Sequence, residues 1–269
     1  MSIEVSYKND VFIKYALGGN DAISCMLRNF IIASLTDLHP VYTEVLNGEM
    51  MPNVLNGKKV ILDILCRDDL INLIDIEMQV SGFAKREYMR FQDYGFRIAE
   101  SKLHRGDDYE NMKKCYQIVF MDAYPSDSKS FIRTFQKRDG DNVLLKHNLI
   151  SLTFVHLPMI NDIVKEKGIE NLTSFEKLCY VFKNGPDDAI LKEKERMERM
   201  VEAIMQKYEE MRSNAPIWSW ASAVERGEQA YYNVIQDKYE EGVEEGMVSL
   251  LSRLLYKNTI SMRLTGYPL

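Results

Sequence analysis

The sequence predicts an α/β fold in which the elements follow the order ααβββαβ, with a helical region after them. Residues 10–35 carry apolar side chains at helical spacing, which indicates two amphipathic helices at the start. Three short apolar runs between residues 41 and 80 have the lengths of strands. A long helical pattern over 83–104 then precedes a buried strand pattern at 115–123.

Both N-terminal helices have recognisable ends. Asn9 or Asp10 can cap the first helix, and Gly18 ends it. Asp21 opens the second helix, whose apolar face consists of Ile23, Met26, Leu27, Phe30, Ile31 and Leu35.

The expected strands are 41–46, 59–67 and 71–80, and Gly106 follows the long helix that comes after them. Two further apolar runs, 131–135 and 149–157, flank a segment that contains Asp139 and Gly140 and therefore indicate a hairpin. Beyond residue 158 the pattern becomes helical, with helices expected at 173–182, at 187–212 and from about 225 onwards. We therefore divide the chain into a core over 1–158 and a helical C-terminal region over 159–269.

Composition excludes several classes of protein. With 46% apolar and 28% charged residues, the chain is ordinary for a globular protein and unlike collagen or a disordered polymer. No apolar run approaches the 20 or so residues that cross a bilayer, and the acidic N-terminus has no signal-peptide core. A cytoplasmic protein without membrane contact is expected. The four cysteines form no CxxC pair, so buried reduced thiols are expected.

The candidate catalytic and metal-binding residues lie between 58 and 79. Asp63 interrupts an apolar strand, and alternation in the next strand places Asp75, Glu77 and Gln79 on one face. A short loop near Leu70 would set Asp63 opposite Glu77 in an antiparallel pair. Two carboxylates so close repel each other unless a cation lies between them, and such oxygen ligands favour Mg²⁺ or Mn²⁺. From the pattern alone, partnered polar residues on a half-exposed sheet are the commoner explanation.

The wider pattern resembles the recombination-promoting nuclease/transposase family within the PD-(D/E)xK nuclease superfamily. The matching segments are 9–18, the strand around Glu44, 58–64 with its LDI strand, 74–79 with its IEMQ sequence, and 86–120, together with 239–246 in the tail. The resemblance implies a restriction-endonuclease-like core, a mixed sheet flanked by helices, and metal-dependent cleavage of DNA in recombination or mobile-element processing. Family tails continue beyond a Thr-Gly turn, whereas this chain stops shortly after Gly266, which is compatible with a truncated or altered C-terminus.

The resemblance also implies roles for single residues. Asp63 and Glu77 become metal ligands and catalytic residues, with Mg²⁺ or Mn²⁺ as the cofactor. Gln79 becomes the third catalytic residue, at the position where the wider superfamily has lysine, and it would orient water because an amide cannot act as a base. Glu44 is a candidate outer-site residue, although a solvated strand residue is the commoner case.

DNA is the expected partner. Lys14, in a Phe-x-Lys pattern of the family, is a candidate phosphate contact, and Arg86 and Arg90 have the helical spacing that suits neighbouring phosphates. Solvated side chains explain these residues equally well. Gly242 and Gly246 are compatible with a homo-oligomer whose C-terminal helices cross, and equally with local flexibility.

Two functions from different classes remain open at this point. One is a Mg-dependent DNA endonuclease, a phosphodiesterase, and the other is a catalytically weak DNA-binding or regulatory module that retains the nuclease fold. The net charge of −6 favours the module, and the intact set of Asp63, Glu77 and Gln79 favours the endonuclease.

Overall fold

A computed structural model describes residues 4–50, 60–80, 85–101, 108–125, 127–187, 190 and 199–230, with short pieces at 233–234, 237–238, 241–243 and 247. Contacts divide the chain into a compact unit over Met1–Val224 and a second unit over Glu225–Leu269. Among the described residues, no helix combines the length and the apolar character needed to span a membrane. Gly246 and the end of the chain lie outside the described residues, so the expectations about helix crossing and about the tail do too.

The order of the elements agrees with the ααβββαβ expectation, with one small additional hairpin. In the described part of the chain, the helices with assigned bounds are α1 (Asp10–Leu17), α2 (Ala22–Leu35), α3 (Lys85–Glu100), α4 (Ile160–Lys167), α5 (Ser174–Asn184) and α7 (Arg199–Ser213). Residues 215–230 are helical as well. The strands are β1 (Thr43–Val45), β2 (Glu49–Met50), β3 (Val60–Ile61), β4 (Ile64–Asp68), β5 (Leu73–Gln79), β6 (Cys115–Met121), β7 (Ile132–Phe135) and β8 (Ile150–His156).

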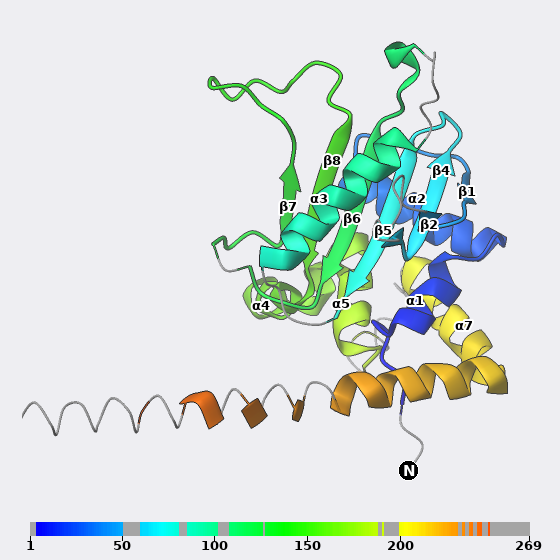
Figure 1. Ribbon diagram of the computed structural model, residues 1–269. Coiled ribbons are helices and arrows are strands. Elements are labelled where there is room, and N and C mark those ends of the chain that lie inside the picture. The colour runs from blue at the N-terminus through cyan, green and yellow to red at the C-terminus, as the bar shows by residue number, and fades with distance from the viewer. Residues whose placement is uncertain are drawn as a thin grey trace, which may run out of the picture. The chain divides into compact units, whose positions relative to one another are not determined.

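Six of the strands form one mixed sheet in the order β1-β4-β5-β6-β8-β7. The pairs β5–β6 and β6–β8 are parallel, and the pairs β1–β4, β4–β5 and β7–β8 are antiparallel. Helix α3 connects β5 to β6 and crosses one face of the sheet over β6 and β8 (Figure 1). The β7–β8 pairing confirms the predicted hairpin.

The two faces of the sheet carry different cores, as strand alternation requires. On one face, Ile74 and Ile76 of β5 belong to the main apolar cluster together with buried residues of α1, α2, α5 and α7. On the other face, Leu73 and Ile98 belong to one small cluster, and Phe91 packs with Phe154 in another. Helix α3 therefore covers the face that carries Asp75, Glu77 and Gln79.

The helix ends follow their capping residues. The Asn9 side chain accepts hydrogen bonds from the backbone N–H groups of the first turn of α1, and Asp21 does the same for α2. Both caps were expected from the sequence. All four cysteines are free and buried, as the absence of CxxC pairs predicted.

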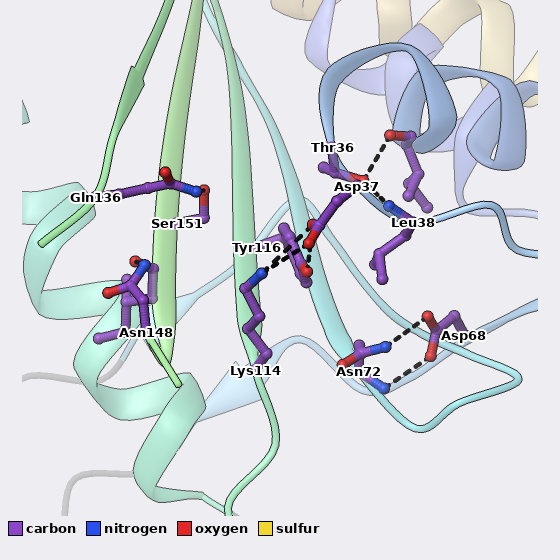
Figure 2. A network of polar contacts seen from close by, with 12 residues as sticks. Thr36, Asp37, Leu38, Asp68, Asn72, Lys114, Tyr116, Gln136, Asn148 and Ser151 are labelled. Carbon is purple, nitrogen blue, oxygen red and sulfur yellow. Dashed lines mark hydrogen bonds and ion pairs between the residues drawn. The ribbon is translucent and has the colours of Figure 1, made fainter. Parts of the chain in front are cut away.

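A tight turn between β4 and β5 sets the register of this strand pair. Asp68 Oδ1 accepts the backbone N–H groups of Leu70 and Asn72, and Asn72 Nδ2 donates to Asp68 Oδ2 at 2.8 Å (Figure 2). Ile71 takes a left-handed backbone conformation, φ 66°, within this turn. The resulting register pairs Ile64 with Ile76, so Asp63 and Glu77 form the next opposed pair.

A second polar group lies at the same end of the sheet, where the parallel strands β5 and β6 begin. Asp37, which follows α2, accepts a hydrogen bond from Tyr116 Oη at 2.6 Å and forms an ion pair with Lys114 at 3.2 Å (Figure 2). This contact joins the end of α2 to the start of β6.

The strand expected over 59–67 is divided in two. Residues Leu62 and Asp63 leave the ladder, and β3 turns away to pair with β2. The reason is that side chains replace backbone partners at this point. The Asp63 N–H donates to Glu77 Oε1 at 2.9 Å, and the Met78 N–H donates to Asp63 Oδ2 at 3.1 Å.

The helical region beyond residue 158 shares the core of the first part of the chain. Phe182 of α5 and Val201, Ile204, Tyr208 and Met211 of α7 belong to the same main cluster as the buried residues of α1 and β5. The Tyr208 hydroxyl donates to the Val5 carbonyl at 2.6 Å. The division at residue 158 thus passes through one hydrophobic core, and the compact unit runs to Val224.

Candidate active site

Asp63 and Glu77 lie against each other where β4 begins and β5 ends. The Glu77 carboxylate accepts a hydrogen bond from the backbone N–H of Asp63. The Asp63 carboxylate in turn accepts one from the backbone N–H of Met78, the residue after Glu77. These reciprocal hydrogen bonds hold both acids in place without any contribution from substrate. Glu77 retains only 5% of its surface exposed, while 14% of the Asp63 side chain is exposed.

Asp75 is a third acid on the same face, and it is fully buried. Gln117 of β6 donates to Asp75 Oδ2 at 3.2 Å, and Asp75 Oδ1 has no hydrogen-bond partner among the described residues. Burial is the main cause that raises the pKa of the Asp75 carboxyl to about 7; the Gln117 hydrogen bond opposes this rise, and the negative charge of Asp63 adds to it. Sequence alternation already placed Asp75 beside Glu77, but only the position of α3 shows that it is buried.

The acids raise one another's proton affinity. Burial and then the negative charges of Asp75 and Asp63 raise the pKa of Glu77 well above its usual range. Burial likewise raises the pKa of Asp63, although the ammonium group of Lys14 opposes this. Clustered acids that resist ionisation are typical of sites that hold a cation or perform acid–base chemistry.

Lys14 reaches the site from α1. Its Nζ lies 3.0 Å from Asp63 Oδ1 and 3.0 Å from Asp10 Oδ2. In this structure, Lys14 therefore contacts the candidate metal ligand directly. The sequence placed Lys14 only as a phosphate contact, and no local pattern showed that α1 would meet the β4–β5 pair.

Gln79 lies at the end of β5, on the same face as Asp75 and Glu77. Its Oε1 accepts a hydrogen bond from Arg90 of α3. The Arg90 charge also opposes the rise in the pKa of Glu77. The structure therefore brings Lys14 and Arg90 to the predicted acids, whereas Arg86, one turn earlier in α3, is exposed.

Glu44 is not brought to this group. It lies opposite Arg67 in the β1–β4 ladder and forms an ion pair with it at 2.6 Å. Arg67 lies four positions beyond Asp63 along the chain, or about 13 Å at the usual rise per residue of a strand. The proposed outer-site role of Glu44 thus has no support from its position.

The donors fit a hard divalent cation. Asp63 and Glu77 offer carboxylate oxygens, each with more than one lone pair, and their negative charges are close together. Among the described residues, no group of three or more His, Cys, Asp or Glu side chains could hold a metal. A site with two carboxylates still suits Mg²⁺, which usually keeps several waters and is bound by one or two carboxylates together with substrate phosphates.

A mixed six-stranded sheet with helices on both faces, and two acids that meet where β4 begins and β5 ends, is consistent with the restriction-endonuclease-like fold of PD-(D/E)XK nucleases. A family model described as PD-(D/E)XK nuclease family transposase matches residues 8–231, and the chain belongs to this family. No curated protein and no solved structure matches the chain. PD-(D/E)XK nucleases generally use divalent metals.

Proposed function

We propose that this protein is a metal-dependent DNA endonuclease, which hydrolyses phosphodiester bonds during recombination or mobile-element processing. The observation that supports the proposal is the pair of Asp63 and Glu77. Each of these carboxylates accepts a hydrogen bond from a backbone N–H at or next to the other acid. Membership of the family supports the class of reaction. The alternative, a DNA-binding module with weak chemistry, is favoured by the acidic net charge alone.

Asp63 and Glu77 would hold Mg²⁺ or Mn²⁺ through their carboxylate oxygens. The bound cation would supply positive charge that lowers the pKa of an attacking water and stabilises negative charge on the phosphate. Gln79 can donate hydrogen bonds to a phosphate oxygen or to water, but it cannot remove a proton. Lys14, beside Asp63, would lie close to a phosphate that enters the site.

Contacts to DNA would be made mainly with its phosphates, from Lys14 and the exposed Arg86. Binding of this type depends little on base sequence and weakens steeply as the salt concentration rises. A binding curve that does not change with salt would contradict this part of the proposal. Association of copies through the C-terminal helix, if it occurs, would appear as a larger species in sedimentation.

The decisive experiment is cleavage of supercoiled plasmid in Mg²⁺, with EDTA as the metal-free control. Wild-type protein should nick the plasmid in Mg²⁺ and leave it intact in EDTA, while Asp63→Ala and Glu77→Gln should reduce nicking to background. Asp162→Asn, on α4 with 47% of its side chain exposed, is the matched control and should cut like wild type.

Calorimetric titration with Mg²⁺ distinguishes the endonuclease from the DNA-binding module. An endonuclease should bind the cation and lose that binding in Asp63→Ala. If wild-type protein binds DNA but neither binds Mg²⁺ nor nicks plasmid, the module is the correct function.

A further inference from the structure

Two arginines of α3 one turn apart have different environments. Arg86 is exposed, as a phosphate contact on the surface would be. Arg90 is partly buried, with its guanidinium 4.7 Å from the ring centre of Phe91 and 5.7 Å from that of Tyr94. Its Nε is buried without a hydrogen-bond partner among the described residues. Arg90 is therefore held against the sheet face that carries the acids.

The contact with Gln79 fixes how the amide is turned. Arginine has only donor groups, so the atom of Gln79 that faces Arg90 must be the carbonyl oxygen, Oε1. Oε1 and Nε2 belong to one planar amide, and hence fixing the oxygen also fixes the direction of the N–H groups. Arg90 thus occupies the acceptor of Gln79 and leaves its donors turned away from the guanidinium.

This arrangement changes what Gln79 can do. A free glutamine amide both donates and accepts hydrogen bonds, whereas lysine only donates and carries a positive charge. With its carbonyl oxygen bonded to a guanidinium, the Gln79 amide has a fixed orientation in which the N–H groups face away from Arg90, and the positive charge lies one hydrogen bond behind them. Polarisation along such a chain strengthens the outer donor.

We propose that Arg90 is a positioning residue that acts through Gln79, so that Arg90 and Gln79 together supply the donor groups and the charge that one lysine supplies elsewhere in the superfamily. This inference rests on the proposed nuclease function. It assigns Arg90 to the active site and not to a contact with the DNA backbone.

The test compares Arg90→Met with Gln79→Ala, alone and combined. Methionine keeps an unbranched apolar side chain over Phe91 and Tyr94, and a melting curve checks that the variant is folded. Single-turnover nicking in Mg²⁺ should slow by about 10- to 100-fold in each single variant, since a displaced active-site group has effects of this size. The double variant should be no slower than Gln79→Ala, because Arg90 acts only through Gln79.

Lysine should rescue the loss. In the Arg90→Met background, Gln79→Lys should recover at least part of the cleavage rate, since one side chain then provides both donors and charge. Arg86→Ala is the matched arginine control. It should weaken DNA binding and lower the slope of log affinity against log salt by about 1, whereas Arg90→Met should leave that slope unchanged.

Three results would overturn the inference: a wild-type rate in Arg90→Met, additive losses in the double variant, or a salt slope that falls as it does for Arg86→Ala.

A measurement that does not depend on DNA cleavage keeps the test independent of the proposed function. In ¹⁵N-labelled protein without metal, the Gln79 side-chain amide signals should stand apart from those of exposed glutamines and should collapse toward them in Arg90→Met. If wild-type protein does not cut DNA, the nuclease proposal fails, and these signals still decide whether Arg90 orients Gln79.

Discussion

Asp75 lies in an environment that is unfavourable to its charge. It is fully buried beneath α3, one carboxylate oxygen bonds to Gln117, and the other has no partner among the described residues. A lone negative charge there would be costly because the neighbouring Asp63 and Glu77 are also acids. The folded protein therefore holds a proton at Asp75 that the unfolded chain would release.

This proton makes stability dependent on pH. Because the folded-state pKa of Asp75 is raised to about 7, its contribution to stability is fully present below about pH 4 and is lost as pH rises through 7. Burial raises the pKa values of Glu77 and Asp63 as well, so their contributions have the same sign. The free energy of unfolding of metal-free protein should fall between pH 5 and 8, by at most about 1.4 kcal/mol per pH unit for each proton.

Urea unfolding in EDTA across this pH range measures the effect. Asp75→Asn keeps an oxygen that can accept the Gln117 bond and removes the ionisable group, so the decline with pH should be smaller in this variant. An equal decline in wild type and Asp75→Asn would show that Asp75 does not retain its proton in the folded protein.

At the scale of the element, Gly95 determines how closely α3 approaches the sheet. A Cβ atom at this position would lie 2.4 Å from Gln117 Oε1 and 3.1 Å from Ile150 Cγ2. Both distances are shorter than ordinary contacts. The missing side chain thus allows the helix to cover the Gln117–Asp75 pair and to hold Arg90 against Gln79.

Gly95→Leu should therefore destabilise the protein, by about 1–3 kcal/mol, although the better helix propensity of leucine opposes part of the loss. The rate of plasmid nicking should fall as well, because leucine at this position displaces α3 from the sheet and moves Arg90 away from Gln79. Gln92→Leu, at an exposed position of the same helix, is the control and should change stability by no more than about 0.5 kcal/mol. If both variants melt at the wild-type temperature, α3 does not need close contact at Gly95.

The elements differ in how far local sequence predicts them. The caps Asn9 and Asp21 define helix starts within a few residues, so α1 and α2 were predictable. Alternation in β5 and a short loop also predicted that Asp63 would face Glu77. The break at Leu62 was not predictable, because it depends on hydrogen bonds between Asp63 and a strand 14 residues away. The roles of Lys14 and Arg90 depend on how two helices dock, which no local pattern contains.

At the scale of the whole molecule, α7 completes the core that the N-terminal helices begin. Tyr208 stacks on Tyr7 with ring centres 4.2 Å apart and meets Phe12 edge-on. Lys207 forms an ion pair with Asp21, the capping residue of α2, at 2.8 Å. The sequence predicted a helix in this region but not the surface against which it packs, and so we divided the chain at residue 158.

These contacts predict how two shortened chains behave. A fragment of residues 1–186 lacks α7, and with it the buried side chains Val201, Ile204, Tyr208 and Met211. Burial of one such side chain contributes about 1.5–3 kcal/mol, so four contribute roughly 6–12 kcal/mol, which is as large as the total stability of most domains. We expect the 1–186 fragment to lose cooperative unfolding and near-UV circular dichroism.

A fragment of residues 1–224 is the matched control, because it keeps the whole compact unit and should unfold in urea as one transition. It should also retain Mg²⁺-dependent nicking, since every residue proposed for the site precedes residue 100. The acids proposed for the site are all present in 1–186 too, so a loss there reflects packing and not missing chemistry. Without α7, Tyr7 and Phe12 lose their ring contacts with Tyr208, and we expect α1 to hold Lys14 less firmly beside Asp63. A 1–186 fragment that unfolds cooperatively within a few degrees of the 1–224 fragment would instead show that the sheet with α1–α5 is an independent folding unit.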